Sequence, residues 1–70
     1  MLSELMTNRL VAMLDNELEE VDKGIRNNSI WRDGSDTPEE AAMFENNILD
    51  LLDYKDVLLN LRERTVEGDI

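Results

Sequence analysis

Cysteine and histidine are both absent from this 70-residue chain, and the two absences exclude most familiar site chemistry. Without cysteine there can be no disulfide and no thiolate zinc site. Without histidine the chain lacks the commonest metal ligand and the usual general base, and the Glu-x-x-His motif of diiron bundles is excluded as well. Ser3, Ser29 and Ser35 have no obvious base beside them. We therefore expect a protein that is not an enzyme and that holds neither a cofactor nor a metal.

Positive charge and long apolar runs are also scarce. The chain has 7 basic residues against 17 acidic ones, a formal net charge of -10. Binding to nucleic acid or to anionic membranes needs lysine and arginine, so we expect neither. No run of about 18 apolar residues is present, and Met1-Leu2-Ser3-Glu4 does not resemble a signal peptide. These observations predict a cytoplasmic protein. The charge suits a partner protein with a basic surface, or serves only solubility.

What the chain does have is helical periodicity. Apolar residues recur three or four positions apart in two segments, and an apolar content of 41% is too high to leave in water. Ser3 suits the start of one helix, and Thr37-Pro38-Glu39-Glu40 has the pattern of a capping box at the start of another. Asn27-Asn28 can end the first helix. We predict one all-α domain over 1–70, an antiparallel two-helix hairpin with helices over 3–26 and 38–66 and a loop over 27–37.

Both predicted helices carry more apolar surface than a single partner helix can cover. A domain of this size buries only about 60% of its unfolded surface, so a further stabilising device is expected, and oligomerisation is the one that remains. We predict that two hairpins pair into a four-helix bundle, a homodimer, although a different protein could cover the same surface. The predicted self-association residues lie far from the loop. They are Leu2, Leu5, Met6, Met13, Tyr54, Val57, Leu58 and Leu61.

Ile30, Trp31 and Arg32 form the segment that we select as a candidate partner-binding site. A tryptophan in a polar loop is costly to leave exposed, and tryptophan and arginine are enriched among interface hot spots. The alternative, which we favour, is that Ile30 and Trp31 fold back and close the loop end of the hairpin.

Carboxylates three residues apart form the one pattern that suggests an enzyme. Such carboxylates share a helical face and could hold Mg²⁺. They are Glu17 and Glu20 in the first helix and Asp50, Asp53 and Asp56 in the second. The spacing resembles that of the all-α nucleoside triphosphate pyrophosphohydrolases, and the resemblance implies a metal-dependent bundle enzyme. The resemblance covers only these positions and departs from the family pattern at Asp50. The chain also has few of the basic residues that would bind phosphates. In so acidic a chain the spacing arises by chance, and we favour solvated acidic faces.

These observations together favour one class of function. We expect a small acidic protein–protein interaction module, such as an inhibitor, adaptor or regulator that binds another protein. Two alternatives stay open: a pyrophosphohydrolase-like bundle that uses its helix carboxylates, and a purely structural assembly unit.

Overall fold

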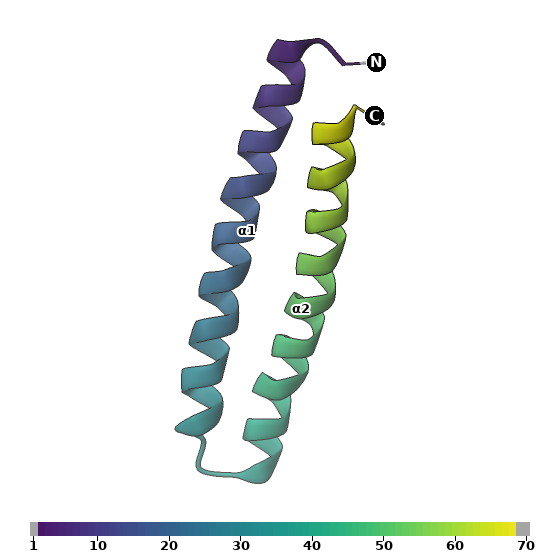
Figure 1. The fold of residues 1–70 in the computed structure, drawn as a ribbon. Coiled ribbons are helices and arrows are strands. Elements are labelled where there is room, and N and C mark those ends of the chain that lie inside the picture. Colours follow the sequence, from purple (N-terminus) through teal and green to yellow (C-terminus); the bar gives the residue numbers. More distant parts are fainter. Residues whose placement is uncertain (1, 69–70) are drawn as a thin grey trace.

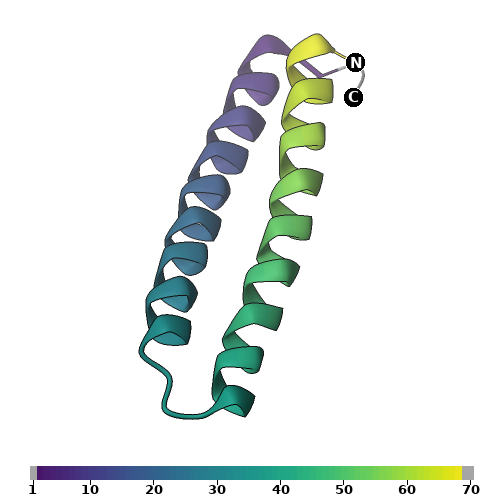
Figure 2. The ribbon, with the colours of Figure 1, turned by 60° about the horizontal axis from the view of Figure 1, so that its bottom comes forward.

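Two long antiparallel helices make up the structure, a computed structural model that describes residues 2–68. Helix α1 is Glu4–Asp33 and helix α2 is Pro38–Glu67. Figures 1 and 2 show them side by side along their whole length, with the loop over 34–37 at one end and the start of α1 beside the end of α2 at the other. The molecule measures 51 × 15 × 10 Å. The predicted all-α antiparallel hairpin is therefore confirmed for the single chain.

Local chemistry sets three of the four helix ends. The Ser3 hydroxyl accepts a hydrogen bond from the Met6 amide at the start of α1, and Thr37 does the same for the Glu40 amide at the start of α2. Each cap satisfies an amide that has no partner within its helix. Gly68 ends α2 in the left-handed conformation, with φ at 82°, which glycine adopts without steric cost. These three positions match the sequence signals for helix starts and stops.

The end of α1 differs from the prediction. The helix continues to Asp33, past its predicted end at residue 26, so the loop spans 34–37 and not 27–37. Asn28 does not stop the helix because its side chain is satisfied inside it: the amide donates to the Gly24 carbonyl at 2.7 Å and accepts from Asn47 of α2 at 3.2 Å. Gly24 also lies within α1, where an added Cβ would come 3.1 Å from a methyl group of Leu51.

The core is a narrow stripe between the two helices. On α1 the buried residues Leu14, Val21 and Asn28 recur every seven positions, the repeat of a coiled coil. Leu14 and Val21 pack against Leu58 of α2, and half-buried leucine and isoleucine side chains surround them. One stripe is all that a single neighbouring helix can cover, so the flanks of both helices remain at the surface.

Neither α1 nor α2 has an apolar stretch long enough to cross a lipid bilayer.

Candidate interaction faces

Many large apolar side chains lie on the surface of this hairpin. Within residues 2–68 only four hydrophobic residues are buried, whereas thirteen large hydrophobic side chains are exposed. Scattered exposed hydrophobics are normal, but contiguous ones mark interaction sites. The question is therefore how these side chains are grouped.

The hairpin has two flanks, one on either side of the buried stripe. Successive helix residues are about 100° apart, so the residues before and after Leu14 point to opposite flanks. Met13 lies on one flank and Asp15 on the other. Asp15 accepts a hydrogen bond from Arg62 of α2 at 2.6 Å. Arg62 therefore lies on the flank of Asp15. Leu61, one position before Arg62 in α2, is turned by about 100° and lies on the flank of Met13.

We call the first flank the methionine face. It consists of Met6 and Met13 of α1 with Tyr54, Val57 and Leu61 of α2, all exposed. The two methionines are seven residues apart, as are Tyr54 and Leu61, which keeps each pair on one side of its helix. These five residues belong to the predicted self-association set, and the fold brings them to a common flank in the half of the hairpin away from the loop.

Three other members of that set lie elsewhere. Leu58 is only 5% exposed and packs against Leu14 in the hairpin core, so its prediction as a self-association residue is corrected: α2 turns this leucine toward α1. Leu5 is 65% exposed but lies nine residues before Leu14, which places it on the back of α1. Leu2 precedes α1 and is half-buried.

Charges of both signs border the methionine face. They lie three, four or seven residues from its members and so share its flank. The cations are Arg9 and Arg64, and the anions are Glu17, Glu20, Asp50 and Asp53. Lys23 and Glu20 form an ion pair at 3.3 Å. This face is therefore bordered by charges of both signs, with more anions than cations.

Tyr54 is the polar member of the methionine face. Its hydroxyl donates a hydrogen bond to a carboxylate oxygen of Glu17 at 3.3 Å, across the two helices. Partial burial of the hydroxyl raises the pKa of Tyr54 above its ordinary value, and the adjacent Glu17 carboxylate raises it further. The neutral hydroxyl is therefore favoured in the folded hairpin.

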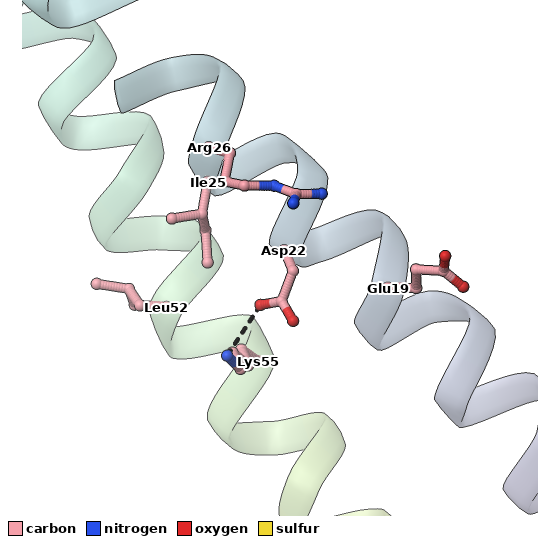
Figure 3. Close-up of a pocket in the computed structure, with 6 residues that line it drawn as sticks. All are labelled: Glu19, Asp22, Ile25, Arg26, Leu52 and Lys55. Carbon is pink, nitrogen blue, oxygen red and sulfur yellow. Dashed lines mark ion pairs between the residues drawn. The ribbon is translucent and has the colours of Figure 1, made fainter. Parts of the chain in front are cut away.

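The opposite flank holds a shallow groove between the helices. We call it the apolar groove. Its floor consists of two rows of apolar residues, one on each helix, and within each row these residues are seven positions apart. Ile25 and Leu52 line the groove, and the spacing of seven extends the two rows to Val11 and Leu18 on α1 and to Leu59 and Val66 on α2. Figure 3 shows its middle, where Ile25 and Leu52 lie next to the ion pair of Lys55 with Asp22.

Acidic residues form both rims of the apolar groove. On the α1 rim, Asp22 pairs with Lys55 at 2.8 Å and Asp15 pairs with Arg62. The hydrogen bond that Arg62 donates to Asp15 raises the pKa of the Arg62 guanidinium, so its charged form is favoured. On the α2 rim, Asp56 and Glu63 are exposed and form no ion pair within the described part of the chain.

Ile30, Trp31 and Arg32 lie in the last turn of α1 and not in a loop. The Trp31 ring packs on Phe44 of α2, with 5.8 Å between ring centroids, and remains 52% exposed. Arg32 forms an ion pair with Glu45. Trp31 and Arg32 thus join the helices at the loop end, whereas Ile30 points outward and is exposed.

The carboxylates three residues apart do not converge. Glu17 accepts a hydrogen bond from Tyr54, and Glu20 pairs with Lys23. Asp50 and Asp56 lie on opposite flanks of α2. Among residues 2–68 no three carboxylates come close enough together to hold a metal ion.

The apolar groove was not predicted from the sequence, although the sequence contains a pattern that marks it. Leu52 and Leu59 satisfy the spacing of the core stripe, so spacing alone assigns them to the core. The signal that separates them is the second, parallel repeat of seven formed with Val66, next to the repeat of buried residues.

Comparison with known proteins gives no relative from which a function could be transferred: no family model, no curated protein and no solved structure matches the chain.

Proposed function

We propose that this chain is a small acidic interaction module of the cytoplasm that is not an enzyme. Two copies pair through the methionine face into a four-helix bundle, and the dimer acts as an inhibitor, adaptor or regulator by binding another protein. The observation that carries the proposal is the methionine face itself, which is apolar and bordered by charges of both signs in a chain of net charge -10.

The energetic case rests on the area left uncovered by the hairpin. Met13 is 67% exposed, and its neighbours on the face are exposed as well. Moving one such side chain from water into a packed contact contributes roughly 1.5 to 3 kcal/mol when burial is complete. Several together can exceed the ordering cost of association.

The charge pattern favours a second copy as the partner on this face. A two-fold axis brings the same patch of each subunit together, so the patch must complement itself. A face bordered by both signs of charge can do so, whereas a face of one sign repels its own copy.

The test is solution mass by light scattering behind a sizing column. We expect the wild type to be a dimer and Met13→Glu with Leu61→Glu to be a monomer, because each glutamate would be buried without a partner in the seam. The loss in dimer affinity should reach at least about a hundredfold.

The matched control places the same charges on the back of α1. Leu5→Glu with Ala12→Glu should leave the mass of a dimer, since both positions lie away from the methionine face. A monomeric wild type, or equal dissociation by both double variants, would show that the methionine face is not a self-association seam.

A further inference from the structure

We propose that the apolar groove docks a basic amphipathic helix of a partner protein. This inference rests on the proposed function, since it specifies where the interaction module binds its partner and what chemistry the partner presents. The docking surface is the flank opposite the methionine face, so dimerisation and partner binding use different sides of the hairpin.

The shape of the groove suits a helix. Two parallel rows of apolar side chains repeat every seven residues, Val11, Leu18 and Ile25 facing Leu52, Leu59 and Val66. The ion pairs of Asp15 with Arg62 and Asp22 with Lys55 fix this register. A third helix laid along the groove would offer an apolar stripe at i, i+3, i+4 and i+7 to successive layers of the floor.

The charge around the groove specifies a basic helix. The cations of α2 on this flank, Lys55 and Arg62, are already bound by Asp22 and Asp15 of the α1 rim. Asp56 and Glu63 of the α2 rim have no ion pair within residues 2–68, so their charge is open to a ligand. Lysine or arginine beside the apolar stripe of the docking helix would face these two carboxylates.

The position of Arg26 indicates at which end of the groove the basic residues of the partner helix should lie. Arg26 lines the groove toward the loop, whereas Asp56 and Glu63 lie toward the chain ends. The basic residues of a docking helix should therefore concentrate at the end of the groove away from the loop.

The same charges exclude a second copy as the preferred occupant. Pairing this flank with itself would bring two rims bearing Asp56 and Glu63 together, and like charges at close range disfavour association. The methionine face carries two cations, Arg9 and Arg64, that form no ion pair within residues 2–68 and can meet the anions of a second copy, so this face remains the seam between copies.

The test uses a synthetic probe helix of about three heptads, with leucine along one stripe and lysine on both sides of it. The probe carries a dye, and fluorescence anisotropy gives its affinity for the full chain. Asp56→Asn with Glu63→Gln should weaken binding about fivefold, as expected for two exposed charge pairs. The control, Asp36→Asn with Asp50→Asn, makes the same change in net charge away from the groove and should leave the affinity nearly unchanged.

A second pair of substitutions tests the floor without changing the charge. Leu52→Asn with Leu59→Asn should weaken probe binding at least tenfold, because two amides would have to lose water against an apolar stripe. The solution mass of this variant should equal that of the wild type. That comparison separates the two proposals: probe binding reports on the apolar groove, and mass reports on the methionine face.

Four results would overturn the inference. One is a wild type that does not bind the probe. The second is equal weakening by the two double variants that each remove two negative charges, which would assign binding to the overall negative charge of the chain. The third is undiminished probe binding by Leu52→Asn with Leu59→Asn. The last is a change in solution mass caused by the floor variant, which would make a second copy the occupant of the groove.

Discussion

At the scale of single residues, Tyr54 offers a direct measurement of the contact between the helices. It is the only tyrosine in the chain, so its ultraviolet titration is free of overlap. We expect a midpoint above the ordinary value of 10.0, because partial burial and Glu17 both disfavour the tyrosinate. Glu17→Gln should lower the midpoint, and Glu19→Gln, outside this contact, should not. A wild-type midpoint at or below 10 would contradict the contact.

The same titration has a consequence for stability. The pKa of Tyr54 is higher in the folded chain than in the unfolded one, so its contribution is complete below pH 10 and is lost as the pH rises through the folded value. Melting temperature should therefore fall in that alkaline range. Tyr54→Phe should reduce the fall.

Asn28 is a buried polar residue whose value lies in specificity. Its amide joins Gly24 of its own helix and Asn47 of α2. A single buried asparagine in a coiled coil fixes the register at a cost in stability. We expect Asn28→Leu to raise the free energy of unfolding by about 1 kcal/mol, since the exposed Asn47 amide can bind water instead. Urea titration measures the change, with the exposed Asn46→Leu as a control near zero. A clear loss of stability would mean that the amide bonds outweigh burial.

At the scale of the helices, the start of α2 depends on one hydroxyl. Thr37 accepts a hydrogen bond from the Glu40 amide at 3.2 Å. Thr37→Ala leaves that amide without a protein partner and should cost about 1 kcal/mol in the free energy of unfolding. Thr37→Ser keeps the hydroxyl and should cost much less. Equal losses in both variants, measured by thermal melting, would mean that the hydroxyl is not the source of the stability.

The two helix starts and the end of α2 could be predicted from the sequence because caps are local. Ser3, Thr37 and Gly68 each act within a few residues of their own position. The end of α1 could not, because the residues that normally stop a helix find partners in the other helix. Asn28 bonds to Asn47, and Gly24 makes room for Leu51. Such contacts exist only once the helices are paired.

At the scale of the whole molecule, the sequence predicts the amount of surplus apolar surface but not its division into two faces. Periodicity identified Met13, Tyr54 and Leu61 as surplus, and all three are exposed. It also grouped Leu58 with them, although this residue is buried in the core. The rotation of each helix about its own axis decides these cases, and packing between the helices sets that rotation.

The division into two faces explains how a chain of net charge -10 could both self-associate and bind a partner. In our proposal, the methionine face pairs with its own copy, and the apolar groove, bordered by Asp56 and Glu63, attracts positive charge.

The positions of Trp31 and Tyr54 allow the order in which the two helices separate to be followed by spectroscopy. The Trp31 ring is held against Phe44 next to the loop, whereas Tyr54 contacts Glu17 farther along the paired helices. The loop tethers one end only, so unzipping should begin where Leu2 and Gly68 lie and travel toward the tether. The tyrosine signal should then change before the tryptophan signal. These two native chromophores would report the separation of the helices at two places along the hairpin, without any added label.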